Sequence, residues 1–451
     1  MRRSVIAGAL LTAMATMVIA CGDEEKAGGT EPQTLTISFN STSTWPEPKA
    51  ILTEAKKGFE ASHPGVTIEL QEEVAADDAY TTKLELRLSA GNDLPDIISI
   101  VPGLADGWAE AGYIQPLDAM LAEWPEWKAA FPDAVRDGAI QADGNIYLVP
   151  LAANDIGIWY NKDVFEGAGL PVPWEPKSWQ DLTDAAATIK DKMPDAIPMH
   201  LYAGKASGAI DNVGKTFLPL LYGTDSTLYD HSTKKWQPAG KGFVDAMTFI
   251  RDSYEAGLTA EEADVLSPEV WSFIGPWMKD AQLGFVPDGN WMSFAWVEGG
   301  SYEWPEWGDR LGVAAFPTQN GEGAGKVSLG YKGAGFGIVK GSDSPNLAME
   351  FIKFASSKES SVGYSQRTGQ LAVRSDVLAD PAYSDRPTVA EFSALLEYAQ
   401  YLPGTAEEVK VWALLTDLIE KVAFGKITPQ EAADSWNSEM SAAVGSSLWA
   451  G

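Results

Sequence analysis

Aromatic side chains are the feature of this 451-residue sequence that most clearly points to ligand chemistry. The chain contains 17 Trp, 14 Tyr and 16 Phe. Their rings are flat, rigid and apolar, so they stack well on the C–H face of a pyranose ring. Most of them must fill the core, and an aromatic residue becomes a binding candidate only through its position in the fold.

Motifs for other kinds of chemistry are incomplete. Val327 follows Gly325-Lys326, and Asn320 stands where a phosphate-binding loop needs its first glycine, which excludes that loop. The sequence has no GxSxG nucleophile motif, and its three His residues are too scattered to predict a metal site. The 63 Asp and Glu residues leave a glycosidase-type pair of catalytic carboxylates as an open alternative.

The pattern of apolar residues predicts the elements that must position any site. Leu35, Ile37 and Phe39 alternate with polar residues, as in a strand, and further strands are expected at 66–70 and 96–101. Helical spacing lies between these strands, so the sequence predicts an open parallel sheet covered on both faces. The same alternation resumes after Val149. Further strands are expected at 156–160, 197–201 and 282–286. Helices are expected to begin at Ser178, with Asp181 completing its cap, and at Thr428, with Glu431 completing its cap, and the end of the chain is expected to be helical.

Two loops are candidates for binding because of where they follow strands. Ligands of open parallel sheets bind beyond the carboxyl ends of the strands. Residues 40–45 follow the first strand with hydroxyl side chains and end in Trp45, and residues 102–106 follow the third strand and end in Asp106. We expect Trp45 and Asp106 to face one crevice and to suit a polyol.

The overall composition excludes several classes of protein. The formal charge is −30, which repels phosphate backbones and excludes nucleic acid as a partner. Hydrophobic residues make up 45% and charged residues 21%, so the chain can bury a large core. A single cysteine, Cys21, excludes a disulfide framework.

The N-terminus has the pattern of an export signal. Arg2 and Arg3 precede an uncharged, mostly apolar run at 4–20, and a polar tract follows Cys21. We predict a signal peptide at 1–20 and a flexible tether at 21–33. The tripeptide before Cys21 resembles a lipobox, in which the cysteine becomes lipid-modified and anchors the mature protein to the membrane. A simple N-terminal membrane anchor is the alternative.

Several stretches, in order along the chain, resemble the family of extracellular solute-binding proteins that includes maltose-binding protein. The most specific stretch runs from the DGNIYLVP segment at 143–150 through the WYNKDVF segment at 159–165 to Trp179. The other stretches are looser, and lie at 91–98, 112–118, 289–291, 312–317, 335–338 and 346–354.

The resemblance implies an α/β fold of two lobes, the type II or Venus-flytrap periplasmic-binding-protein fold, with interleaved lobes and a helical C-terminal end. The first lobe would hold 34–152 and 328–358, and the second 153–327 and 359–451. Hinge motion near Ala152 and Ser328 would close the lobes on a ligand. The implied function is that of an exported, lipid-anchored, monomeric component of an ABC importer that captures a carbohydrate and delivers it to the permease. Neither enzyme activity nor a cofactor or metal is implied.

The resemblance also implies the position of site residues. Trp291 occupies the place of the family's stacking aromatic, and Asn154 and Asp155 lie just past the first crossing. Tyr331 and Lys332 lie beside the second crossing. Trp412, on a C-terminal helix, is a further candidate.

Two alternatives remain open at this stage. A secreted polysaccharide-degrading lipoprotein would use the same aromatics with a carboxylate pair about 5 to 10 Å apart. A binding protein for another solute, such as a peptide, polyamine or sugar phosphate, is the second alternative.

Overall fold

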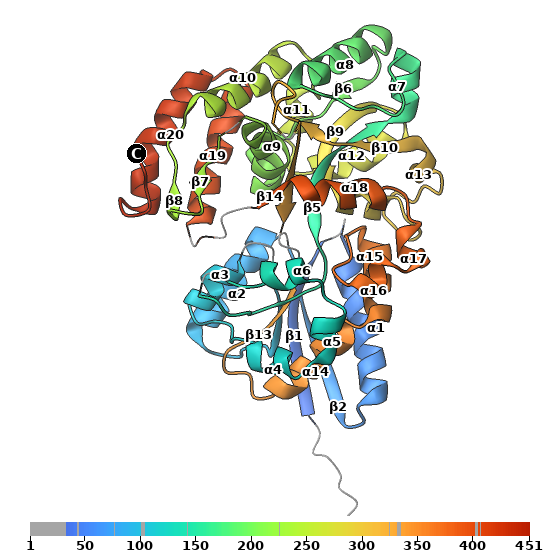
Figure 1. Cartoon of the computed structure of the whole chain (residues 1–451), viewed down its shortest axis with the longest axis vertical. Coiled ribbons are helices and arrows are strands. Elements are labelled where there is room, and N and C mark those ends of the chain that lie inside the picture. The colour runs from blue at the N-terminus through green and yellow to red at the C-terminus, as the bar shows by residue number, and fades with distance from the viewer. Residues whose placement is uncertain are drawn as a thin grey trace, which may run out of the picture.

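The structure is a computed structural model that describes residues 33–451 apart from 43–44, 76, 101–103, 142, 225, 324, 332–334, 402–404 and 406. Its two lobes, one above the other in Figure 1, each contain a sheet covered by helices. Cys21 and the predicted signal peptide lie outside the described residues.

The smaller sheet has the strand order β2-β1-β3-β13-β4. The strand β1 pairs in parallel with β2 and β3, whereas β13 pairs antiparallel with β3 and β4. The three strands predicted at the start of the chain are therefore confirmed, and two later segments complete their sheet. Its strands are β1 (Gln33–Ser41), β2 (Val66–Val74), β3 (Ile97–Ile100), β4 (Val149–Pro150) and β13 (Gly335–Ile338).

Helices flank this sheet because their apolar residues recur on one side. In α1, Leu52, Ala55 and Phe59 are buried, and Phe59 meets Phe351 of α14 edge to face at 5.4 Å. The helices of this region are α1 (Glu47–Ser62), α2 (Asp77–Ala90), α3 (Ala105–Glu110), α4 (Asp118–Ala122), α5 (Pro125–Ala129), α6 (Asp133–Gly138), α14 (Pro345–Ala355), α15 (Lys358–Thr368), α16 (Ser375–Leu378) and α17 (Pro381–Ser384).

The larger sheet has the order β11-β12-β5-β9-β6, with β10 paired to β5 and β14 paired to β12. Its central strand β5 is buried along its whole length and contains the strand predicted at 156–160. The strands are β5 (Asn154–Asn161), β6 (Ile197–Met199), β9 (Leu283–Gly289), β10 (Leu311–Ala314), β11 (Phe316–Pro317), β12 (Lys326–Tyr331) and β14 (Ala399–Tyr401), with a separate hairpin of β7 (Tyr229–Asp230) and β8 (Lys235–Trp236).

The helices around the larger sheet include the two capping boxes expected from the sequence, Ser178 with Asp181 in α8 and Thr428 with Glu431 in α20. A π-helix, η2, stands out among them because most helices keep the α-helical turn. The elements are α7 (Lys162–Ala168), α8 (Trp179–Lys192), η1 (Lys205–Ser207), η2 (Ile210–Phe217), α9 (Leu218–Tyr222), α10 (Lys241–Glu255), α11 (Glu262–Val265), α12 (Val270–Lys279), η3 (Asn290–Ala295), α13 (Trp307–Arg310), α18 (Val389–Leu395), η4 (Leu396–Tyr398), α19 (Glu408–Ala423) and α20 (Pro429–Val444).

The second crossing between the lobes differs from the expectation of a return at Ser328. The hydroxyl of Ser328 donates to the carbonyl of Ile156 at 2.9 Å, and β12 pairs with β5 up to Tyr331, so this strand stays in the larger sheet. The segment that follows α14 was expected in the larger lobe, but α15 packs beside α1 of the smaller lobe (Figure 1). The other residue boundaries given above for the two lobes remain predictions.

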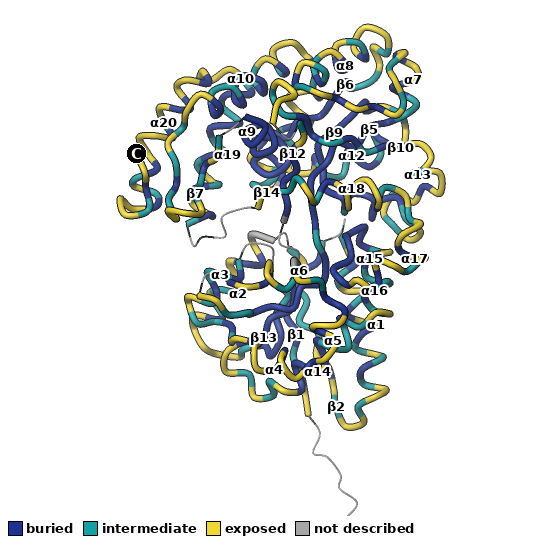
Figure 2. The backbone as a smooth tube through the Cα atoms, viewed as in Figure 1, coloured by how far each residue is buried: buried dark blue, intermediate teal, exposed yellow. Residues whose placement is uncertain are grey.

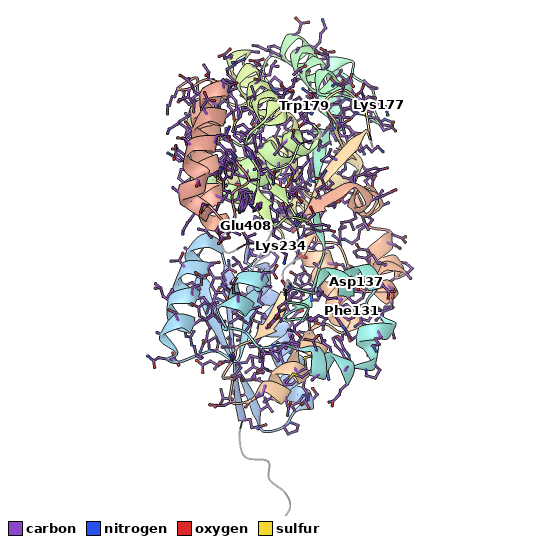
Figure 3. The ribbon with its side chains drawn as sticks, turned by 60° about the vertical axis from the view of Figure 1, so that its left-hand side comes forward. Phe131, Asp137, Lys177, Trp179, Lys234 and Glu408 are labelled. Atoms are coloured by element: carbon purple, nitrogen blue, oxygen red, sulfur yellow. The ribbon has the colours of Figure 1, made fainter. Side chains whose placement is uncertain are left out.

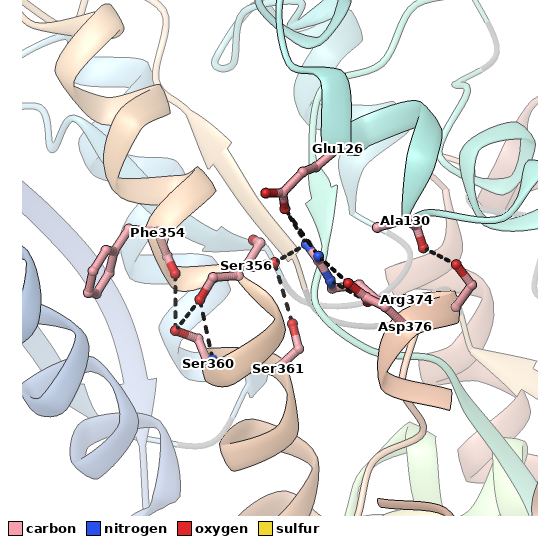
Figure 4. A network of polar contacts seen from close by, with 10 residues as sticks. Glu126, Ala130, Phe354, Ser356, Ser360, Ser361, Arg374 and Asp376 are labelled. Atoms are coloured by element: carbon pink, nitrogen blue, oxygen red, sulfur yellow. Dashed lines mark hydrogen bonds and ion pairs between the residues drawn. The ribbon is translucent and has the colours of Figure 1, made fainter. Parts of the chain in front are cut away.

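A buried arginine fixes that later segment to the smaller lobe (Figure 4). The side chain of Arg374 is 2% exposed and donates to Glu126 at 3.1 Å, to Asp376 at 2.8 Å and to the carbonyl of Ser356 at 2.8 Å. Its guanidinium carbon lies 5.3 Å from the ring centroid of Phe131. These contacts join α5, the end of α14 and the start of α16, so 359–376 does not belong to the larger lobe.

Buried residues run through the middle of each lobe (Figure 2). The sequence WPEW occurs twice, at 124–127 and 304–307. All four of its Trp side chains have exposed fractions of 8% or less, so both segments pack into the core. In the described part of the chain, no helix is long and apolar enough to cross a membrane.

Candidate ligand-binding site

Three segments from different parts of the chain meet at Asn290, where the chain passes between the lobes. Its amide oxygen accepts from the backbone N–H of Asp155 at 2.9 Å. Its amide nitrogen donates to the carbonyl of Gly369 at 3.1 Å and lies 3.3 Å from Oδ1 of Asn154. Asn290 is 2% exposed, so water does not compete for these bonds. The amide therefore ties the start of β5 to η3 and to the end of α15.

Close backbone approach at this junction depends on Gly369. Its φ is +68°, and a Cβ there would lie 2.2 Å from Oγ of Ser293 and 3.0 Å from the carbonyl oxygen of Trp291. Just beyond it, Ala153 and Leu371 exchange two backbone hydrogen bonds of 2.9 and 3.0 Å. A side chain at 369 would push this segment away from η3.

Trp291, the aromatic residue expected to stack on a ligand, follows Asn290 directly. It is half-buried and packs against two of the core clusters of the larger lobe. Its ring lies across Gly289, where a Cβ would come within 2.3 Å of the ring atoms. The glycine thus allows the indole to lie flat against the end of β9.

A buried lysine lies behind this ring. Nζ of Lys215 is 2.8 Å from Oδ1 of Asp211 and 2.8 Å from Oδ1 of Asp288, and the three side chains are only 1% to 3% exposed. Asp288 also accepts from the backbone N–H of Gly289 and from the hydroxyl of Tyr202, each at 2.7 Å. We call Tyr202, Asp211, Lys215 and Asp288 the Lys215 cluster.

Three aromatic rings surround the ammonium group of Lys215. It lies 4.6 Å from the ring centroid of Tyr202, 5.0 Å from that of Trp271 and 5.7 Å from that of Trp291. Each distance is within the range of a cation–π interaction. Trp271 is half-buried, like Trp291, whereas Tyr202 is fully buried.

Burial sets the protonation states of these groups. Burial lowers the pKa of Lys215, but the charges of Asp211 and Asp288 more than reverse this and keep the lysine charged. Burial raises the pKa of Asp211 to about 6, although Lys215 opposes the rise. Burial also lowers the pKa of His200, which lies against the Tyr202 ring, to about 3, and the charge of Lys215 adds to this effect. His200 is therefore neutral at physiological pH.

Asp155, in β5, is a further buried carboxylate of the larger lobe. It is 0% exposed. Burial raises its pKa well above the usual range, and the hydroxyl of Ser328 offsets a smaller part. Burial, with the charge of Asp155 as a second cause, raises the pKa of Tyr401, so Asp155 lies toward β14.

The two strand-end candidates lie between the lobes. Trp45 follows β1 of the smaller sheet, yet packs against a core cluster of the larger lobe. Asp106 is in the first turn of α3. Burial raises the pKa of Tyr229 in β7, and the charges of Glu407 and Asp106 add to the rise, so Asp106 faces the larger lobe.

The remaining candidates are Tyr331, Lys332 and Trp412. The backbone of Tyr331 pairs with Asn154 at the end of β12, and Lys332 lies outside the described residues. Trp412 meets Trp236 edge to face at 5.6 Å at the rim of the core. It stands one turn after Glu408, which lies where the lobes face each other in Figure 3.

Sequence reasoning grouped Trp291 with Asn154 but missed the Lys215 cluster and Asn290. Asp211 and Lys215 stand four residues apart, a spacing that favours an ion pair. No signal in the sequence joins them to Asp288 or Trp271. In the described part of the chain, no group of three or more His, Cys, Asp and Glu side chains could hold a metal ion.

Comparisons with known proteins identify the family and support the fold. The family model for bacterial extracellular solute-binding proteins matches residues 42–361. A putative binding protein of Brucella abortus is 26% identical over 402 residues, which cover 88% of this chain and 89% of that protein. The multiple sugar-binding protein of Streptococcus mutans is 28% identical over 184 residues, 40% of each chain. The crystal structure of the GacH receptor of Streptomyces glaucescens, described unliganded and with acarbose, has a TM-score of 0.77 at 22% identity and covers 92% of this chain and 100% of that one. The expected two-lobed α/β fold is confirmed.

Proposed function

The chain belongs to the family of bacterial extracellular solute-binding proteins, and from this premise we propose that it captures a carbohydrate between its lobes for an ABC importer. The proposed ligand is an oligosaccharide, and the proposed recipient is the transmembrane permease. We further propose that the protein is exported, monomeric and anchored through lipidated Cys21, and that it leaves its ligand chemically intact.

The observation that carries this proposal is the position of Trp291. A half-buried indole lies at the end of β9, next to the amide of Asn290 that joins the segments between the lobes. An aromatic face at a hinge can stack on a sugar ring while the lobes close over it. Polar side chains from both lobes, Asp106 and Asn154, supply hydrogen bonds to hydroxyl groups in the proposed complex.

Calorimetric titration of the purified mature protein with neutral di- and trisaccharides tests the proposal. Truncation of a buried aromatic anchor costs about 2 to 4 kcal/mol, so Trp291→Ala should bind the best sugar roughly 30-fold to 1,000-fold more weakly. The matched control is Trp277→Ala, because Trp277 is also half-buried in the larger lobe but does not contact Lys215.

Two results would contradict the proposal. Equal affinity of wild type and a folded Trp291→Ala protein would remove Trp291 from the binding site. Release of shorter saccharides during long incubation, abolished by an acidic-residue substitution, would instead indicate a hydrolase.

A further inference from the structure

We propose that the Lys215 cluster makes ligand affinity depend on pH, because protonation of Asp211 releases one of the two carboxylates that hold Lys215 behind Trp291. The ligand binds tightly near neutral pH and more weakly in acidified surroundings. This inference rests on the proposed function, since it describes the regulation of the same site.

The buried charges of the cluster do not balance. Nζ of Lys215 lies 2.8 Å from Oδ1 of Asp211 and 2.8 Å from Oδ1 of Asp288, and these three side chains are only 1% to 3% exposed. When both carboxylates are ionised, one negative charge is left uncompensated away from water. Such a charge is costly to bury, so the cluster favours the uptake of one proton.

Hydrogen bonds decide which carboxylate takes up that proton. Asp288 accepts from a backbone N–H and from the hydroxyl of Tyr202, each at 2.7 Å, in addition to its ion pair with Lys215. Among the described residues, the donors to Asp211 are Lys215 and the side chain of Trp271. Because donors favour the ionised form, the proton goes to Asp211 rather than to Asp288. Burial raises the pKa of Asp211 to about 6, although Lys215 opposes the rise.

The charged side chains that act on Asp211, among the described residues, are those of Lys215 and Asp288. His200, which lies against the ring of Tyr202, is neutral because burial lowers its pKa to about 3. Elements around η2 also carry Tyr222 in α9, Phe243 in α10, Trp271 in α12, Thr416 in α19, and Lys205 in η1, whose ammonium group pairs with Asp417 and Glu420 of α19. The state of Asp211 is therefore set inside the cluster.

The release of Lys215 reaches the proposed ligand site through aromatic contacts. Its ammonium group lies 5.7 Å from the ring centroid of Trp291 and 5.0 Å from that of Trp271, within the range of cation–π attraction. A protonated Asp211 no longer balances the charge of Lys215, so the ammonium group is drawn toward Asp288. Trp291 then loses part of the support that fixes its position, and a less preorganised ring binds a ligand more weakly.

The direction of the effect follows from this arrangement. Asp211 is already 2% exposed without a ligand, so closure of the lobes adds little burial that could favour its protonated form. The ligand therefore favours the ionised form. Coupling between two sites is reciprocal, so ligand binding lowers the pKa of Asp211 and releases protons near pH 6.

Calorimetric titration at pH 7.5 and pH 5 with maltotriose, cellotriose and mannotriose tests this dependence. Couplings are typically about fivefold or more, so the wild type should bind its best trisaccharide about fivefold more weakly at pH 5. Binding at pH 6 should release protons, which appear as a dependence of the measured heat on the ionisation enthalpy of the buffer.

Asp211→Asn keeps an oxygen acceptor for Lys215 but has no charge, so it imitates the protonated form. It should bind equally at both pH values, with the affinity that the wild type has at pH 5, and should release no protons. Retention of the full pH dependence by this variant would overturn the inference.

The matched control is Glu47→Gln, because Glu47 is another described carboxylate whose pKa burial raises into this range, to about 7. Glu47 lies in the first turn of α1 in the smaller lobe, so its replacement should leave the pH dependence of the affinity as in the wild type. Loss of the dependence in Glu47→Gln would overturn the inference and assign the effect to α1.

The outcomes also separate this inference from the function on which it rests. Equal affinity of the wild type at both pH values would overturn the pH dependence and leave the proposed function intact. Absence of binding to every saccharide at either pH would overturn the proposed function itself.

If Asp211→Asn does not fold, Trp271→Phe serves in its place. This change removes the N–H donor to Asp211 but keeps an aromatic ring beside Lys215. Loss of a donor favours the protonated carboxyl, so the pH at which affinity falls by half its range should move upward. An unchanged midpoint in a folded Trp271→Phe protein would overturn the role of Asp211.

Discussion

Replacement of Asn290 by alanine tests whether one amide holds the segments between the lobes together. The change removes the acceptor for the N–H of Asp155 and the donor for the carbonyl of Gly369, bonds of 2.9 and 3.1 Å. Each of these two buried polar groups costs about 1 to 3 kcal/mol when left unsatisfied, so we expect a loss of about 2 to 6 kcal/mol in the free energy of unfolding. The contact with Asn154 at 3.3 Å is too long to add much.

Urea unfolding of the ligand-free protein, followed by tryptophan fluorescence, measures this loss. The matched control is Asn437→Ala, because the amide of Asn437 also makes two backbone hydrogen bonds but is exposed. It accepts from the N–H of Ala239 at 2.8 Å and donates to the carbonyl of Ala239 at 3.4 Å. Water can replace its bonds, so its loss should stay below about 1 kcal/mol. A loss in Asn290→Ala no greater than that of the control would refute the reasoning, since water would then reach the junction.

Three further predictions concern other parts of the chain. The pKa of His200 in the folded protein is about 3, below its unfolded value, so the unfolded state takes up the proton first as the pH falls. We expect this group to lower the free energy of unfolding by about 2 kcal/mol between pH 7 and pH 5. Urea unfolding of His200→Leu at the two pH values should therefore show a fall in the free energy of unfolding that is smaller by that amount. Asp211, with its pKa raised to about 6, opposes the drop in both proteins, and an equal drop in both would contradict the role of His200. Arg374→Met should lower the free energy of unfolding by about 1 to 3 kcal/mol, because the carbonyl of Ser356 loses its buried donor while Glu126 and Asp376 regain water. The control Arg251→Met breaks an exposed ion pair with Asp252 and should cost less than about 1 kcal/mol. Equal losses in the two variants would argue against a stabilising role of the Arg374 network. Cys21→Ser should release the protein from membranes or leave it uncleaved in cell fractionation, whereas a cleaved serine variant retained in the membrane would rule out the lipid anchor.

Much of the fold could be predicted because its signals are local. The alternation of Leu35, Ile37 and Phe39 with polar residues predicts a strand, and the buried residues of α1 repeat at helical spacing. Ser178 with Asp181 and Thr428 with Glu431 could be paired because a capping box joins residues only three apart. The return between the lobes was placed too early at Ser328, because a strand that continues through a larger sheet looks the same as one that starts a new lobe.

The candidate site could be predicted only in part. Trp45 and Asp106 follow strand ends, and that position can be read once the strands are known. Trp291 and Asn154 could be named only through the resemblance to the family. The direction of Asp155 could not be read, since an adjacent residue on a strand points to the opposite face and only the packing of β14 and Ser328 decides what lies there. Asp155 is therefore buried toward β14, while Trp271 was not among the candidates.

The sequence by itself determined the class of fold and the family, and it predicted aromatic stacking as the binding chemistry, because each depends on residue type, order and short-range spacing. Only the tertiary structure decided which residues meet. Lys215 and Asp288 are 73 positions apart, from 288 − 215, and Asn290 reaches Gly369 across 79 positions. Such pairs form when separate elements pack, and their energy depends on burial that no local pattern encodes. The Lys215 cluster and the Asn290 junction therefore emerged from packing alone.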